Sequence, residues 1–325
     1  MVYEKKNISM SDGKVNAFHC WTPDSPDDIR AVMLLSHGMA EYAERYAPFA
    51  GKLVSEGIAL FAEDHRGHGE TAAMAEKEGT GMFGYLGDRD GFRRVVEDIH
   101  EEILLLRGIY PGKKLVLFGH SFGSFVAQCV IELYGALLDG CILCGTAGPR
   151  PLTVGFARVV GNLVCAFGGK KRKSNLISSL SFGPYNARIR NPSTEFDWLS
   201  RDPEQVARYI NHPWCGFVCT GEFYRDLFRG LGLIHRKKMI ASIPKDLPVL
   251  FIDGTGDPVG GYGKTVSALR DIYVKNGVKD VEIRLYEDAR HELLNETNRD
   301  EVASDVLKWV SDRFLACLDE PLPEH

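Results

Sequence analysis

The chain has 325 residues, of which 44% are hydrophobic and 26% are charged, and its formal net charge is -5. This composition excludes a disordered or fibrous protein, and a chain of this length buries enough apolar surface to fold without disulfides or a structural metal. The slightly acidic balance gives no electrostatic reason to expect nucleic acid as a partner.

Cysteine usage and the lack of long apolar runs indicate a cytoplasmic, soluble protein. Several of the eight cysteines lie inside apolar runs, where a free cysteine behaves as a small hydrophobe. Cys141 and Cys144 have the spacing of a metal-binding pair, but no second pair stands at a zinc-site distance. No signal-peptide core precedes Lys14, and no apolar run approaches the ~20 residues of a membrane span. The cysteines are Cys20, Cys129, Cys141, Cys144, Cys165, Cys215, Cys219 and Cys317.

Short apolar runs alternate with helical patterns through most of the chain. Nearly continuous apolar strands are buried on both faces, which is typical of a mostly parallel sheet. The expected strands are residues 31–35, 58–62, 114–118, 141–144, 249–252 and 281–286. Helical periodicity lies between them, and a glycine follows each of the first three helices. These helices are residues 46–54, 95–106, 125–133 and 302–310. The alternation predicts a doubly wound α/β fold.

The alternation breaks between about Arg150 and Lys245, where no convincing strand occurs. We predict an α/β core built from residues 1–149 and 246–325, with a helical cap inserted at 150–245. The cap is expected over the C-terminal edge of the sheet, where open α/β folds bind ligands. Residues 170–173 form a basic run, for which a solvated loop and a membrane-surface contact are both open interpretations.

The five residues 119–123 read Gly-His-Ser-Phe-Gly, directly after an expected strand and before an expected helix. This is the context of a nucleophilic serine on a tight turn. A Cβ at Gly119 or Gly123 would crowd the neighbouring backbone. The helix that follows directs free N–H groups and a partial positive charge at the serine. The pattern predicts Ser121 as the nucleophile, and the competing interpretation is a helix N-cap with incidental glycines.

A nucleophilic serine needs a base, and the base needs an acid that orients it. Four histidines follow Ser121 in the sequence. His212 and His235 fall in the insertion, and His325 is the last residue. His291 follows the last expected strand, in a loop where a base would face the serine. We therefore predict that His291 is the general base.

The acid is expected in the loop after the strand at 249–252. Asp253 stands at the end of that strand, whereas Asp257 lies beyond two glycines and can reach back over the sheet. We favour Asp257 and interpret Asp253 as a turn or capping carboxylate. Glu287 or Asp288 would be the next candidate if neither aspartate orients the histidine.

Two backbone N–H groups are expected to hold the negative charge that develops during acyl transfer. One belongs to Phe122, directly after the nucleophile. The other belongs to Met39, in the loop after the strand at 31–35, where Gly38 allows close approach of the backbone. The competing interpretation of His37 and Gly38 is a simple strand-ending turn.

A second polar motif, Asp-His-Arg-Gly-His-Gly at 64–69, ends the next strand. Two histidines and an aspartate invite a metal interpretation, but no fourth ligand is evident nearby. We expect a structural turn braced by Asp64 and Arg66, with no metal and no cofactor.

Five segments together resemble the monoacylglycerol lipase and lysophospholipase group, which is often classed with the serine aminopeptidase-like α/β hydrolases. They are residues 37–46, 64–69, 119–123, 254–259 and 290–292, and the insertion is similar to the cap of bacterial members at 196–202 and 213–217. The resemblance implies an α/β-hydrolase fold and hydrolysis of a carboxylic ester through an acyl-enzyme. It implies a lipid-like acyl ester such as a monoacylglycerol or a lysophospholipid as substrate.

The chain departs from this group at two positions. Tyr42 stands where the group often has a histidine, and Leu294 stands where eukaryotic lipase members have a second histidine. Such polar positions help members of the group to bind glycerol. Glu41 and Arg45 remain, and with His120 they are the expected substrate contacts.

Two other functions compete with ester hydrolysis. A peptidase that removes N-terminal residues would need carboxylates in the cap to hold the substrate ammonium, and five acidic residues of the insertion could supply them. A ligand receptor on this fold would normally lack part of the catalytic set, and here every part has a candidate. The five acidic residues are Glu195, Asp197, Asp202, Glu204 and Glu222.

Overall fold

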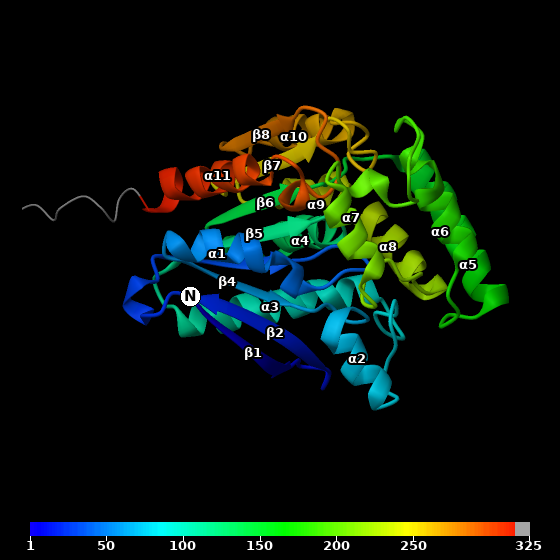
Figure 1. Ribbon diagram of the computed structural model, residues 1–325, viewed down its shortest axis with the longest axis horizontal. Helices are drawn as coiled ribbons and strands as arrows, with labels where there is room; N and C mark the ends of the chain where they lie inside the picture. Colours follow the sequence, from blue (N-terminus) through cyan, green and yellow to red (C-terminus); the bar gives the residue numbers. More distant parts are fainter. Residues whose placement is uncertain (316–325) are drawn as a thin grey trace, which may run out of the picture.

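In the computed structural model, which describes residues 1–315, eight strands form one sheet in the order β1-β2-β4-β3-β5-β6-β7-β8 (Figure 1). The β1–β2 and β2–β4 pairs are antiparallel, and the remaining five pairs are parallel. The predicted mostly parallel sheet is confirmed. The strands are β1 (Val2–Ser9), β2 (Val15–Thr22), β3 (Ala31–Ser36), β4 (Ile58–Glu63), β5 (Lys114–His120), β6 (Gly140–Cys144), β7 (Val249–Gly254) and β8 (Val281–Tyr286).

Strands β1 and β2 are absent from the predicted set. β1 is an exposed edge strand, so it carries polar residues on both faces and no apolar run. β2 is buried, but Asn16 and His19 interrupt its apolar sequence. Asn16 donates a hydrogen bond to Glu63 at 2.5 Å, a partner that the sequence pattern does not reveal.

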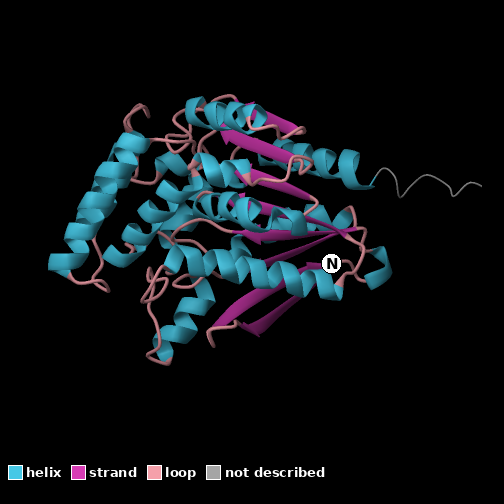
Figure 2. Ribbon diagram, turned by 180° about the vertical axis from the view of Figure 1, so that it is seen from behind, coloured by secondary structure: helices cyan, strands magenta, loops and turns pink. Residues whose placement is uncertain are grey.

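Helices cover both faces of the sheet, as the doubly wound prediction requires (Figure 2). The buried faces of α1 and α11 pack in one apolar cluster, and those of α3, α4 and α10 pack in another on the opposite side. The helices outside the β6–β7 connection are α1 (Ala47–Ser55), α2 (Gly69–Lys77), α3 (Gly91–Ile109), α4 (Phe122–Tyr134), α10 (Lys264–Lys275) and α11 (Arg299–Val310).

Residues 145–248, called the insertion below, connect β6 to β7 and add no strand to the sheet. The insertion is largely helical, as expected, and it lies beyond the ends of β5, β6 and β7 (Figure 1). This is the edge at which parallel α/β folds bind ligands. Its helices are α5 (Pro151–Gly168), α6 (Asn175–Phe182), α7 (Pro203–Asn211), α8 (Gly221–Ile234) and α9 (Lys237–Ala241).

Helix α5 corrects one expectation from the sequence. It has 18 residues with a mean hydropathy of 1.4, so by length and composition it could cross a membrane, although no run of this kind was expected. Scattered glycine and polar residues, including Arg158, break its apolar sequence and hide it from a search for uninterrupted runs. Only 11% of the helix is buried against the rest of the protein.

Seven of the eight cysteines lie in the described chain, and all seven are free and buried. The expectation of free thiols is confirmed for these seven. Cys317 and His325 lie outside the described residues.

Candidate active site

Ser121 lies on a sharp turn between β5 and α4. Its backbone has φ 52° and ψ -117°, a conformation that non-glycine residues rarely adopt. A Cβ at Gly123 would overlap the carbonyl oxygen of Ser36, and a Cβ at Gly119 would come within 2.5 Å of the carbonyl oxygen of Gly123. Both glycines are therefore required sterically, and the predicted strand, turn and helix are confirmed.

His291 and Asp257 meet Ser121 at the carboxyl end of the sheet. His291 Nε2 lies 2.8 Å from Ser121 Oγ, and His291 Nδ1 lies 2.8 Å from Asp257 Oδ2. The second carboxylate oxygen of Asp257 accepts a hydrogen bond from the Val259 N–H at 2.8 Å. Hydroxyl, imidazole and carboxylate thus form one hydrogen-bonded chain. Among the described residues, His291 Nδ1 is hydrogen-bonded to Asp257 and makes no hydrogen bond to Asp253.

The loop that carries His291 is fixed to the insertion. The His291 N–H donates to the Trp198 carbonyl at 3.3 Å, and the Glu292 N–H donates to the Leu199 carbonyl at 2.7 Å. The Trp198 ring also lies against the imidazole, with the ring centroids 5.1 Å apart. The insertion therefore helps to place the imidazole as well as covering it.

The charges around His291 favour its protonated form. Burial lowers the pKa of His291, but the charge and hydrogen bond of Asp257 outweigh burial, so the pKa is raised above its usual value. Burial likewise pushes the pKa of Asp257 upward, yet His291 brings it below the usual value. The neighbouring His120 behaves in the opposite way, because burial lowers its pKa to about 3 and leaves it neutral.

Phe122 and Met39, the two residues whose N–H groups were expected to hold the oxyanion, lie at the same cavity as Ser121. Phe122 is the first residue of α4, so its N–H has no acceptor within the helix. The Met39 N–H donates to no acceptor among residues 1–315. Both residues line the cavity that also contains Ser121 and His291. The two residues thus lie at one cavity with N–H groups that have no acceptor in the described chain, and their role as oxyanion donors stays a prediction.

The direction of the Met39 N–H is set by His37, a role that the sequence does not reveal. His37 Nδ1 donates to the Gly38 carbonyl at 2.7 Å, while His37 Nε2 accepts from the His65 N–H at 3.0 Å. The Gly38 carbonyl and the Met39 N–H belong to one trans peptide and point in opposite directions. Holding the carbonyl on His37 therefore turns the N–H away from it. The only sequence signal was a histidine directly before the glycine.

The three expected substrate contacts differ in their surroundings. Glu41 and His120 line the cavity with Ser121, whereas Arg45 lines a second cavity of about 650 Å³. Glu41 accepts hydrogen bonds from the Gly38 N–H at 2.6 Å and from the Tyr46 hydroxyl at 2.9 Å. Substrate contact by these three residues stays a prediction.

Arg45 ties two of the site's loops together. Its guanidinium donates to Glu41 at 2.5 Å and makes two 2.7 Å bonds to the carboxylate of Glu292. Glu41 borders the loop of Met39, and Glu292 follows His291 directly. Two-point arginine–carboxylate contacts fix geometry as well as charge. Glu292 was missed, and its only sequence signal was its place next to the histidine.

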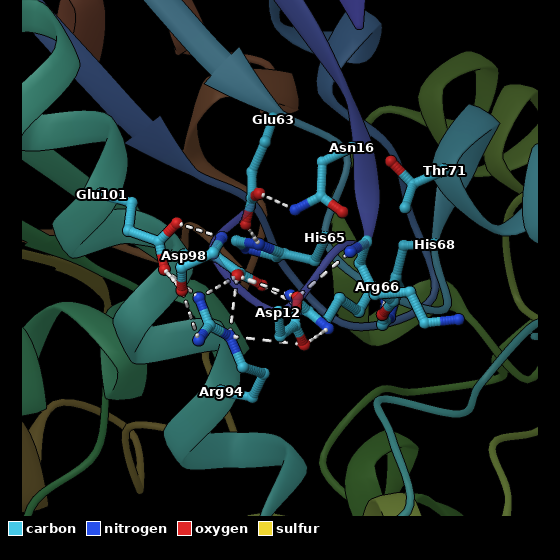
Figure 3. Close-up of polar contacts among 12 residues, drawn as sticks. Asp12, Asn16, Glu63, His65, Arg66, His68, Thr71, Arg94, Asp98 and Glu101 are labelled. Atoms are coloured by element: carbon cyan, nitrogen blue, oxygen red, sulfur yellow. Dashed lines mark hydrogen bonds and ion pairs between the residues drawn. The ribbon is translucent and has the colours of Figure 1, made fainter. Parts of the chain in front are cut away.

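The motif at 64–69 is a braced turn, as expected (Figure 3). Asp64 accepts hydrogen bonds from the N–H groups of Ala43 and Glu70, each at 2.7 Å. Arg66 pairs with Asp98 and with Asp12. Within residues 1–315, no group of three or more His, Cys, Asp or Glu side chains could hold a metal ion.

The cavity over Ser121 has a volume of about 670 Å³ and is walled largely by the insertion. Its apolar walls come from several helices of the insertion and from α4. Not every apolar side chain of the insertion reaches the cavity. Leu163, Phe167 and Leu176 face solvent, and Phe223 is packed in the core. Among the wall residues are Phe125, Phe156, Leu180, Phe182, Trp198, Leu227 and Phe228.

The carboxylates that a peptidase would need do not gather in this cavity. Glu195 alone of the five lines it. Asp197 accepts from the Ser193 N–H at 2.7 Å, and Asp202 caps α7. Glu222 pairs with Arg225. An ammonium site built from these side chains is therefore not present in the described chain.

The comparisons with known proteins agree with this geometry. The serine aminopeptidase S33 family matches residues 27–298. The monoacylglycerol lipase of Mycolicibacterium smegmatis is 27% identical over 301 residues, covering 90% of this chain and 91% of that protein. The human monoglyceride lipase is 25% identical over 312 residues, covering 93% and 89%. A thermostable carboxyl esterase from Bacillus coagulans, solved with glycerol, superimposes with a TM-score of 0.87 at 28% identity, covering 97% and 100%.

Proposed function

The chain belongs to the serine aminopeptidase S33 family, and on that premise we propose that it is a serine hydrolase of lipid-like carboxylic esters. The resemblance to monoacylglycerol lipases is confirmed by the relatives above, and so is the α/β-hydrolase fold. One observation carries the proposal. The hydrogen-bonded chain from Ser121 through His291 to Asp257 opens into an apolar cavity.

The proposed reaction passes through an acyl-enzyme. Ser121 Oγ attacks the ester carbonyl as His291 Nε2 takes its proton. The N–H groups of Met39 and Phe122 hold the oxyanion, and the imidazolium then protonates the departing alcohol. Water repeats the sequence and releases the fatty acid. Asp257 holds the imidazole with Nδ1 protonated, so that Nε2 is free to act as the base.

The cavity favours an ester with an acyl chain over an aminoacyl substrate. Its apolar walls match an alkyl chain, and of the five acidic residues of the insertion that could hold a substrate ammonium only Glu195 lines it. We place the acyl group of a monoacylglycerol or lysophospholipid in this cavity. We also propose that residues 150–245 act as the cap that encloses it, over a core of residues 1–149 and 246–325.

We expect kcat/KM to rise with acyl length until the cavity is filled. Each buried methylene contributes about 0.8 kcal/mol, which is up to about fourfold in kcat/KM. The measurement is a series of 4-nitrophenyl esters from acetate upward, run beside monoacylglycerols and aminoacyl-4-nitroanilides. Preference for the anilides would show that the protein is a peptidase. A series that is flat or falls from acetate would make the protein a small-ester esterase.

We place the enzyme in the cytoplasm, where free thiols persist. The seven cysteines of the described chain are all unpaired, which suits a reducing compartment.

We further propose that the cap touches a lipid surface with anionic head groups. Five apolar residues recur at helical spacing along the exposed side of α5, and two of them, Leu152 and Phe167, are 90% and 87% exposed. The basic residues Lys170, Lys171, Arg172 and Lys173 follow the helix directly. An apolar helix face beside basic residues is suited to the interface of an anionic membrane. The remaining three residues of the stripe are Phe156, Val159 and Leu163.

Replacing Leu152 and Phe167 together with glutamate should weaken binding to phosphatidylcholine vesicles containing phosphatidylglycerol by about tenfold or more, because burying each side chain is worth more than 1 kcal/mol. Co-sedimentation measures the binding, and hydrolysis of soluble 4-nitrophenyl butyrate should stay unchanged. The matched control places glutamate at Leu104 and Ile109, which are exposed on α3. Equal binding by both double variants and the wild type would remove α5 from the membrane contact.

A further inference from the structure

A second buried carboxyl group accompanies Asp257. Asp253 is the second-last residue of β7, four residues before Asp257, and both side chains are fully buried. Neither carboxyl oxygen of Asp253 accepts a hydrogen bond from a donor in the described chain. The loop after Asp257 packs tightly on it, because a Cβ at Gly260 would overlap Asp253 Oδ2.

These surroundings keep Asp253 protonated. Burial raises the pKa of Asp253 well above its usual value, and the negative charge of Asp257 raises it further. The Arg150 guanidinium lowers the pKa of Asp253, but it acts more weakly than burial and Asp257. A buried carboxylate without firm donors costs several kcal/mol, so the group remains neutral. A neutral carboxyl carries one O–H, which needs an acceptor.

The buried acceptor that the adjoining loop offers is Asp257, whose negative charge raises the pKa of Asp253 more than any other charge does. Asp257 already accepts from His291 Nδ1 and from the Val259 N–H. A third donor from β7 would hold the carboxylate from the side of the sheet. Because β7 is fully buried and paired on both sides, with β6 and β8, it is a rigid support for that donor.

We propose that Asp253 is a positioning residue, which donates the hydrogen bond of its protonated carboxyl to Asp257 and so holds that carboxylate against His291. This inference rests on the proposed function, because it assigns Asp257 as the acid that orients the base. Asp253 touches neither substrate nor His291, and it acts through Asp257 alone.

The hydrogen bond should also tune the base. A donor to Asp257 disperses its negative charge, so loss of the donor strengthens the attraction between Asp257 and the imidazolium and raises the pKa of His291. The other charged or titratable groups that face this region include Glu41 after β3, His120 at the end of β5, Cys144 at the end of β6, Arg150 before α5, Tyr185 in the insertion and Glu292 after β8. These groups stay in place when Asp253 alone is changed.

The test compares Asp253→Leu, which removes the donor at similar volume, with Asp253→Asn, which keeps a neutral donor of the same shape. We expect the Asn variant to retain kcat within about threefold and to keep the wild-type acid limb of kcat/KM. The Leu variant should lose about tenfold or more in kcat with little change in KM. Its acid limb should move up by about one pH unit, the equivalent of one hydrogen bond to a charged group.

Two results would overturn the inference. One is a Leu variant with wild-type kcat and an unmoved acid limb. The other is an Asn variant as impaired as the Leu variant, which would mean that the charge of Asp253 is needed. If the Leu variant does not fold, Asp253→Ala is measured under the same criteria. Failure of the proposed function looks different, because the wild type itself would then lack ester turnover.

Discussion

Replacing Ser121 with alanine should lower kcat for ester hydrolysis by about four to six orders of magnitude, as removal of a serine nucleophile does elsewhere. The variant keeps the oxyanion donors and the cavity but has no oxygen to acylate. Its fold should persist, because the Ser121 side chain bonds only to His291 in the described chain. Steady-state ester assays measure the loss of kcat, and thermal unfolding measures whether the fold persists.

Ser179→Ala is the matched control for this variant. Ser179 lines the same cavity from α6, and loss of its hydroxyl should leave kcat within about twofold, a difference typical of a position outside the reaction. Near-normal ester turnover by the Ser121→Ala variant would refute the assignment of the nucleophile.

Replacing Asp257 with asparagine should have the second largest effect, lowering kcat by about two to four orders of magnitude. An amide at this position donates to Nδ1 rather than accepting from it, which favours the wrong tautomer of His291. The pH profile should change as well. Asp257 raises the pKa of His291, so the wild type loses activity as pH falls through that raised value. In the pH profile of the Asn variant, the acid limb should move to lower pH and the plateau activity should be far below that of the wild type.

The ranking of two aspartates makes this prediction specific. Asp253→Asn should be mild, because it keeps a neutral donor to Asp257. The reverse ranking would move the orienting role to Asp253. The structure removes the next candidates, since Glu287 and Asp288 are both exposed whereas His291 is buried. Neither side chain reaches His291 within the described contacts.

The residues that meet around Ser121 could be predicted because each is tied to a local pattern. The glycines at 119 and 123 require a tight turn, and parallel strands bring their following loops to one edge. Chain order then separates His291 from the other histidines. The same reasoning recovers the central strands, whose burial on both faces makes them continuously apolar.

The features that the sequence did not predict depend on contacts between distant residues or on elements without a continuous apolar run. β1 is an edge strand with no apolar run to reveal it, and α5 hides its apolar stripe among polar residues. The bond of His65 to His37 arises only when the loops after β3 and β4 lie side by side, and the pairing of Arg45 with Glu292 requires the same of the loops after β3 and β8. Asp253 was interpreted as a turn carboxylate, because the pattern shows its place but not its lack of donors.

The proposed mechanism requires Ser121 to be an activated nucleophile, and a fluorophosphonate that reacts only with such serines detects this property without a substrate. Intact-mass measurement followed by peptide mapping locates the adduct. We expect one phosphonyl group per chain, on Ser121, with labelling lost in Ser121→Ala and strongly slowed in Asp257→Asn. An unlabelled wild-type chain, or an adduct on another residue that persists in Ser121→Ala, would contradict it.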